Sequence, residues 1–450
     1  MSTPRLLASA ALAASILIAV VAAPAMASAG QPSASPLPAL PQVASAQRGA
    51  AWLAGQFTGG YIPSTTTPGQ PDLAATANAV LALASAGVDS TALTGLTYLE
   101  SNVNAYVLDD GSDGPGQLAL LILDAHALGV DPHGFGGSNL VARLQATERT
   151  TGVDAGLFGA QDPTFDGAYR QGLALAALAA AGVTSGTPVG SADGWLTGQQ
   201  CPDGGWTSYV TTDNPCNGDP ADYEGPDTNS TALAVEGLSA QGDLGAPAAK
   251  QALKFIKSAQ DSDGGWGYEP DAAHAPGSTD PDSTALVLQA VLALGKSPAK
   301  GFAKGSANPV SALLSYQLTS GTGKGAFYFP GSSDPDLLAT YQAVPAVAGV
   351  AVPFDLAVTT ASLPAATVGQ PYSTALTGSG GRPPYTWKVL AGSGALPSGL
   401  KLGKASGMIS GKPKAVGTST FTVEVLDTKS TGSPSTQDTA WKVLSITTSA

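Results

Sequence analysis

The segments DTNSTALAVEGLSAQG (Asp227–Gly242) and DPDSTALVLQAVLALG (Asp280–Gly295) decide the fold, because the chain repeats their pattern. Each opens with an Asp, which caps helix N-termini, and closes about sixteen residues later with a Gly, which ends helices. All six such segments are apolar nearly all round, so they predict helices that are buried on every side. The other four are Asp72–Gly87, Asp113–Gly129, Asp166–Gly182 and Asp334–Gly349.

A more amphipathic kind of helix is expected between these segments, at Val43–Gln56, Pro188–Gln200 and Ala246–Gln260. Six buried helices that alternate with half-exposed ones fit one arrangement, in which the inner helices form a barrel and the outer helices wrap around it. The sequence therefore predicts a mainly α fold, an α6/α6 toroid over residues 42–350.

Two glycine turns share one spacing, Gln200…Asp203-Gly204-Gly205-Trp206 and Gln260…Asp263-Gly264-Gly265-Trp266. They resemble the Gln-Trp repeats of the prenyltransferase and squalene-cyclase superfamily, and the resemblance covers residues 40 to 350. In that family the motif is structural: the Gln caps an outer helix and the indole stacks nearby. The resemblance implies this role for Gln200, Trp206, Gln260 and Trp266, and a ligand-binding role of the two Trp residues is the alternative.

The pattern changes at residue 355. Short runs of Val, Thr, Tyr and Trp alternate there and are punctuated by Gly and Pro, which predicts a small all-β sandwich over 355–450. The net charge also changes sign, since residues 1–353 carry 12 Lys+Arg and 29 Asp+Glu, and residues 354–450 carry 8 and 4. This stretch resembles the immunoglobulin-like, cadherin-like modules of bacterial surface proteins, which implies display, spacing or adhesion.

The first residues have the organisation of an export signal. Arg5 precedes an apolar run from Leu6 to Val21, and small residues at Ala25-Met26-Ala27 suit signal peptidase. We expect a signal peptide over 1–29, a linker over 30–41 and a secreted, extracellular or cell-wall-associated protein without a transmembrane segment in the mature chain; an N-terminal membrane anchor is the alternative. Because an exported chain favours disulfides, Cys201 and Cys216 are expected to pair.

The sharpest candidate for chemistry is Asp280-Pro281-Asp282-Ser283-Thr284-Ala285. It resembles the D-x-D-D-T-A box of squalene–hopene and class II diterpene cyclases, which implies a general-acid role for Asp282 beside Asp280. Ser283 replaces one of the acids of that box. Neighbouring repeats share parts of the motif, so the competing interpretation is a helix N-cap at Asp282.

Several functional classes fit the composition poorly. A net charge of −13 without clustered Lys or Arg excludes nucleic-acid binding, and two Cys and three His leave little material for a metal site. We expect no cofactor and no metal. The acidic insertion 201–229 holds oxygen ligands suited to Ca²⁺, although a solvated loop is the simpler interpretation.

Aromatic residues make up only 6% of the chain, which disfavours carbocation chemistry.

The sequence leaves three hypotheses for the function. The first is non-catalytic binding of a hydrophobic small molecule or a glycan in the toroid or at its mouth. The second is an isoprenoid-processing, terpene-cyclase-like enzyme that uses Asp282. The third is a structural wall protein with a plugged cavity.

Overall fold

The computed structural model describes residues 42–159, 166–208, 216, 225–270, 279–354, 356–360, 362–379, 383–428 and 439–450. The expected signal peptide and the linker lie outside the described residues, and so does most of the acidic insertion. Within the described residues, every helix is too short or too polar to cross a bilayer.

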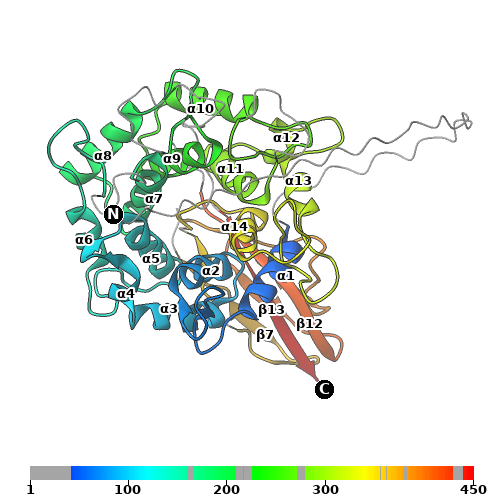
Figure 1. Cartoon of the computed structure of the whole chain (residues 1–450). Coiled ribbons are helices and arrows are strands. Elements are labelled where there is room, and N and C mark those ends of the chain that lie inside the picture. The colour runs from blue at the N-terminus through cyan, green and yellow to red at the C-terminus, as the bar shows by residue number, and fades with distance from the viewer. Residues whose placement is uncertain are drawn as a thin grey trace, which may run out of the picture. The chain divides into compact units, whose positions relative to one another are not determined.

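Six helices form a closed inner barrel (Figure 1). Each of them packs against the next, in the order α2, α5, α7, α9, α11 and α14, and α14 returns to α2. This arrangement confirms the predicted toroid. The six are α2 (Leu73–Ser85), α5 (Pro115–Ala127), α7 (Ala168–Ala180), α9 (Thr228–Gln241), α11 (Pro281–Ala293) and α14 (Leu337–Ala348).

Four inner helices begin with the same pair of contacts. The capping Asp accepts a hydrogen bond from the backbone N–H three residues later, at 2.6 to 2.9 Å. The Thr four residues after the cap accepts the backbone N–H of a buried residue in the preceding turn, at 2.9 to 3.0 Å. This pair fixes each turn onto its helix. The Asp–Thr pairs are Asp72–Thr76, Asp227–Thr231, Asp280–Thr284 and Asp336–Thr340.

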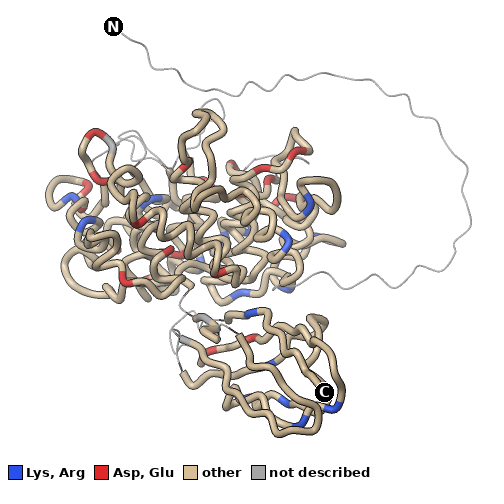
Figure 2. The backbone as a smooth tube through the Cα atoms, turned by 90° about the horizontal axis from the view of Figure 1, so that it is seen from below, with Lys and Arg blue, Asp and Glu red and all other residues tan. Residues whose placement is uncertain are grey.

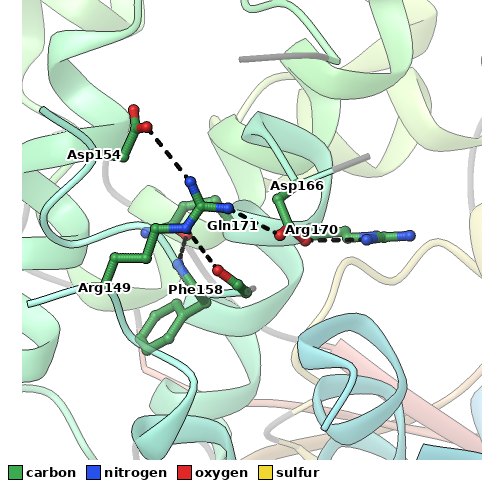
Figure 3. A network of polar contacts seen from close by, with 7 residues as sticks. Arg149, Asp154, Phe158, Asp166, Arg170 and Gln171 are labelled. Atoms are coloured by element: carbon green, nitrogen blue, oxygen red, sulfur yellow. Dashed lines mark hydrogen bonds and ion pairs between the residues drawn. The ribbon is translucent and has the colours of Figure 1, made fainter. Parts of the chain in front are cut away.

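Helix α7 begins differently (Figure 3). Asp166 is fully buried, and its carboxylate lies 3.2 Å from Arg149 and 3.0 Å from Arg170. Gln171 takes the place of the Thr, since its side-chain oxygen accepts the N–H of Phe158 at 2.9 Å. The predicted capping by Asp166 is therefore wrong, because its carboxylate forms ion pairs with the two guanidinium groups instead.

Glycines let α7 approach α9 closely. A Cβ atom at Gly172 would lie 2.1 Å from the carbonyl oxygen of Leu233, and one at Gly237 would lie 2.3 Å from the carbonyl oxygen of Gly172. A larger residue at either position would force the two helices apart. The ring can close at this point only because both positions lack a side chain.

Outer helices surround the barrel, and the amides of the Gln-Trp motifs join them. Gln200 donates to the carbonyls of Gly204 and Ala248, and Gln260 donates to those of Gly264 and Phe302, so each Gln links successive repeats instead of capping a helix. The outer helices are α1 (Val43–Ala54), α3 (Asp89–Glu100), α4 (Val103–Val107), α6 (Leu140–Ala146), α8 (Thr187–Gly198), α10 (Ala246–Ser258), α12 (Pro298–Gly301) and α13 (Pro309–Ser315).

A third amide closes the outer ring. Gln317 donates to the carbonyl of Gly325 in its own turn and to that of Ser45 in α1, both at 2.9 Å, and it accepts from Arg48. The last repeat is thereby joined to the first, 272 residues away. The described residues 42–354 thus form a ring in both layers.

The C-terminal residues form the predicted immunoglobulin-like β module. One sheet has the order β6-β13-β12-β9, and a second has the order β10-β11-β7. A separate core that includes Trp387, Ile409 and Phe421 fills the space between them. The strands are β5 (Ala357–Val358), β6 (Ala366–Thr367), β7 (Tyr372–Ala375), β8 (Gly378–Ser379), β9 (Thr386–Val389), β10 (Leu400–Leu402), β11 (Met408–Gly411), β12 (Gly417–Leu426) and β13 (Thr439–Ser449).

Strand β13 also makes contacts with the helical domain. The indole N–H of Trp441 donates to the carbonyl of Ala348 at 3.0 Å, and the ammonium of Lys442 lies 2.7 Å from the carboxylate of Asp89. Figure 2 shows that most of the Asp and Glu residues lie in the helical domain. The Lys442–Asp89 pair therefore joins a charge of the more basic module to one of the acidic toroid.

Candidate ligand site inside the inner barrel

The two aspartates of the D-P-D-S-T-A motif have different roles. Asp280 caps α11, since its Oδ1 accepts the N–H of Ser283 at 2.7 Å. Asp282 lies in the first turn of the helix, and its Oδ1 is buried without a hydrogen-bond partner among the described residues. The N-cap interpretation is thus confirmed for Asp280 and is wrong for Asp282, whose carboxyl does not satisfy the helix end.

The surroundings of Asp282 favour its neutral form. Burial, together with the negative charges of Asp280 and Asp336, raises the pKa of this carboxyl to about 7. A carboxyl with such a pKa carries a proton in a large share of molecules at neutral pH. Asp282 can therefore donate a hydrogen bond or a proton, which an ordinary aspartate does not do at this pH.

Two tyrosines lie within electrostatic range of Asp282. Tyr169 belongs to α7 and Tyr341 to α14, and these helices stand opposite each other in the ring of six. Burial raises the pKa of both phenols, and the negative charge of Asp282 raises it further; Tyr169 also contributes to the raised pKa of Tyr341. Asp282, Tyr169 and Tyr341 are therefore close enough to influence one another, although they come from three different helices of the inner ring.

The inward faces of α7 and α14 are incompletely buried. Leu173 follows Tyr169 by one turn and Leu337 precedes Tyr341 by one turn, and all four side chains are half-buried against the core of the toroid. By contrast, the described residues of α11 from Pro281 to Val291 are all buried. These two helices of the inner ring thus keep partly exposed apolar surface.

Two further carboxyls lie inside the barrel wall. Asp124 on α5 has no exposed surface, and neither of its oxygens has a hydrogen-bond partner among the described residues. Glu236 on α9 accepts the N–H of Val352 at 3.1 Å through Oε2, while its Oε1 has no partner there. Burial raises the pKa of Asp124 well above its ordinary value and that of Glu236 to about 8. Glu236 is therefore mainly protonated at neutral pH, and burial shifts Asp124 in the same direction.

The remaining candidates of the sequence analysis have structural positions. Trp206 and Trp266 are fully buried, and their indole N–H groups donate to the carbonyls of Leu196 and Ile256 at 2.7 Å, so neither ring is available to a ligand. Cys201 and Cys216 form the predicted disulfide. The described residues contain no group of three or more His, Cys, Asp or Glu that suits a metal ion, and most of the acidic insertion lies outside them.

Comparison with known families identifies two parts of the chain. Residues 164–278 match the squalene-hopene cyclase C-terminal domain. Residues 355–443 match the family described as "Putative Ig domain". These matches confirm the two resemblances seen in the sequence. The first ends before Asp280, so it covers the Gln-Trp motifs and leaves the D-P-D-S-T-A motif outside. No curated protein has a significantly similar sequence.

Solved structures with related architecture are distant in sequence. The type II terpene cyclase MstE from Scytonema is 17% identical over 69% of this chain and 98% of that one, with a TM-score of 0.48. Protein geranylgeranyltransferase-I from Candida albicans is 12% identical over 62% of this chain and 86% of the Candida chain, with a TM-score of 0.45. A Bacteroides fragilis protein described as a putative alpha-galactosidase is 23% identical over 21% of this chain, with a TM-score of 0.17. The match covers only 18% of the length of the Bacteroides protein.

Sequence reasoning missed most of the interior site. Asp124 and Glu236 are isolated acids within otherwise apolar helical segments, and that contrast is a signal that the sequence does contain. Tyr169 and Tyr341 carry no such signal, because their nearness to Asp282 depends on the closure of the ring.

Proposed function

We propose that the protein is a secreted or cell-surface protein whose toroid binds a small molecule inside the inner barrel, beside Asp282, Tyr169 and Tyr341. The observation that carries this proposal is the buried Oδ1 of Asp282, which has no hydrogen-bond partner among the described residues and lies within electrostatic range of two phenols. A buried polar atom without a partner costs folding free energy, so its retention favours a functional role. The β module serves display or adhesion in this proposal.

The chemistry of the interior restricts the ligand to an uncharged molecule. A protonated Asp282 and the two phenols supply hydrogen-bond donors, which suit a hydroxyl, ether or carbonyl oxygen of the ligand. The tyrosine rings, with Leu173 and Leu337, supply apolar surface. The negative charges of Asp280 and Asp336 disfavour a diphosphate at this place. A hydrophobic molecule with one or two oxygens, or a glycan, meets these conditions.

Thermal stabilisation of the purified mature protein tests the proposal. A panel of uncharged isoprenoids, corrinoids and glycans is screened for a rise in melting temperature, since a ligand stabilises the fold that binds it. Asp282→Leu removes the donated O–H with little change in volume and should weaken binding about tenfold, the value of one lost hydrogen bond. Asp334→Leu is the matched control, because Asp334 opens the corresponding D-P-D motif and is exposed. Equal stabilisation of both variants would contradict the proposal.

A second candidate is supported by one specific observation. The pKa of about 7 at Asp282 suits a general acid that protonates an alkene or epoxide, and Asp280 lies close enough to contribute to that value. In this reaction the carboxyl gives its proton to the substrate carbon or oxygen, and a base must later remove a proton from the cyclised product. The alternative function is therefore isoprenoid cyclisation with Asp282 as the acid.

Product analysis separates the two candidates. The purified protein is incubated with squalene, oxidosqualene and linear prenyl diphosphates, and cyclic products are sought by mass spectrometry. The binding proposal predicts no cyclic product from the wild type. A cyclic product that disappears in Asp282→Asn would establish the enzyme instead, because an amide cannot supply the proton.

Export is tested on the protein itself. Cleavage after Ala27 or Ala29 would leave a mature N-terminus just before the linker, so N-terminal sequencing of protein from the culture medium or the cell wall should begin at residue 28 or 30. Recovery of the intact N-terminus from membranes would favour the anchor that the sequence left open.

A further inference from the structure

A cleft of about 470 Å³ lies away from the barrel interior. It borders the C-terminal ends of α2 and α5 and the start of α3, whereas Asp282 lies at the N-terminal end of α11. Strands β5 and β13 and the segment before β5 complete its wall. Apolar side chains from these elements line much of it, among them Leu93, Leu128, Val350, Leu356, Val358 and Trp441.

The polar side chains of the cleft are already engaged. The indole N–H of Trp441 donates to the carbonyl of Ala348, and Lys442 and Asp89 neutralise each other at 2.7 Å. This pair therefore gives the cleft no net charge. The surface that remains for contact with a ligand is mainly apolar. Three more polar side chains in the wall also have partners, namely Ser85, His126 and Thr359.

The rim of the cleft is open to solvent. Leu93 on α3 keeps 43% of its surface exposed. Ligand pockets in proteins commonly enclose 300–1,000 Å³ and are lined mainly by apolar side chains, and this cleft falls within that range. Its size suits one small molecule and is too small for a folded partner.

We propose that this cleft is a second binding site, independent of the barrel interior, and that it takes an uncharged, mainly apolar small molecule. The charge balance carries the assignment of ligand class. A charged ligand would have to break the Lys442–Asp89 pair to find a counter-ion, whereas an uncharged one leaves that pair intact. Leu93 forms the outer edge of the site, and Trp441 lies in its wall.

Titration with N-phenyl-1-naphthylamine, an uncharged apolar fluorescent probe, tests this proposal on the full mature chain. We expect saturable fluorescence enhancement that includes one site per chain sensitive to substitution of Leu93, distinct from any binding in the barrel interior. Leu93→Glu places a carboxylate at the rim and should weaken probe binding at least about tenfold, because an apolar ligand would desolvate the new charge. Leu338→Glu is the matched control: Leu338 is 42% exposed and lies at the start of α14, so probe binding should not change.

A second variant guards against an indirect effect of the charge. Ala127→Phe adds bulk within the cleft and should also abolish saturable binding at this site, while a circular-dichroism melt confirms that each variant is folded. The proposal is overturned if the wild type shows no saturable binding, or if Leu93→Glu and Leu338→Glu bind the probe equally well. Light scattering accompanies the titration, and dimers that dissociate in Leu93→Glu would show that a second copy of the chain covers the cleft instead. None of these outcomes depends on Asp282.

Discussion

Glu236 makes the stability of the toroid depend on pH. Burial raises the pKa of its carboxyl from 4.5 to about 8, so the folded protein keeps the proton in a pH range where the unfolded chain has lost it. Stability contributed by the neutral group is complete below pH 4.5 and is lost progressively as the pH rises to about 8. Each pKa unit corresponds to about 1.4 kcal/mol, which gives an upper limit of about 5 kcal/mol for the whole range.

Glu236→Gln removes this titration and keeps the side-chain shape. The amide oxygen can still accept the N–H of Val352, so the contact with the segment after α14 is retained. Guanidinium unfolding of the mature protein is measured at pH 5, 7 and 9 for the wild type and the variant. The free energy of unfolding of the variant relative to the wild type should rise by about 2–5 kcal/mol between pH 5 and pH 9.

The control is the same substitution at an exposed position. Glu269 is exposed and lies in a bend of the chain. Glu269→Gln should therefore shift the free energy of unfolding by less than about 0.5 kcal/mol at every pH. The other buried acids remain in both proteins, so their titration cancels when the variant is compared with the wild type. A difference between Glu236→Gln and the wild type that stays constant from pH 5 to pH 9 would refute the reasoning.

Three further predictions follow from contacts in the fold. Asp280→Ala should cost about 1 kcal/mol in the free energy of unfolding and Asp280→Asn much less, because Asn caps nearly as well as Asp; equal losses would contradict capping. Reduction of the Cys201–Cys216 disulfide should lower stability by about 3 kcal/mol for a loop of this length, measured by chemical unfolding with and without reductant; unchanged unfolding would show that the loop is constrained otherwise. Residues 355–450 expressed alone should melt cooperatively as a β protein, because the module has its own core, and a disordered product in circular dichroism would show that it needs the contact between Trp441 and Ala348.

The sequence predicted the inner helices well because each is marked at both ends. The six Gly residues that close them all have positive φ, between 65° and 82°, which explains why Gly stands there. The start was harder to place where two Asp residues flank a Pro. In α11 the first Asp is the cap, and in α14 the second is, Asp336. The Thr four residues after the true cap distinguishes the two, and this relation became visible only with the turn contacts.

The candidate site was predictable only in part. The resemblance to cyclases drew attention to Asp282, but the repeat pattern suggested that it was a cap, and only the hydrogen bond of Asp280 separates the two roles. Asp166 shows the same limitation in reverse, because its expected capping role depends on whether Arg149, 17 residues earlier, and Arg170, four residues later, reach its carboxylate. Local sequence reports the types of residue that can cap a helix, whereas burial and long-range partners decide which of them does.

The two ends of the barrel interior differ chemically, and this difference bears on how a ligand would reach it. Just after the C-terminal end of α14, the backbone N–H of Val352 donates a hydrogen bond to the carboxyl of Glu236. The chain itself therefore fills a position beside the barrel wall at that end. Near the helix starts, Asp282 keeps an oxygen without a partner, and Tyr169 and Tyr341 remain half-buried. In the proposed function a ligand would therefore enter from the end where the helices start. An obstruction at that end would raise the barrier for entry and for exit alike, so it would slow ligand association and dissociation by a similar factor and leave the affinity unchanged.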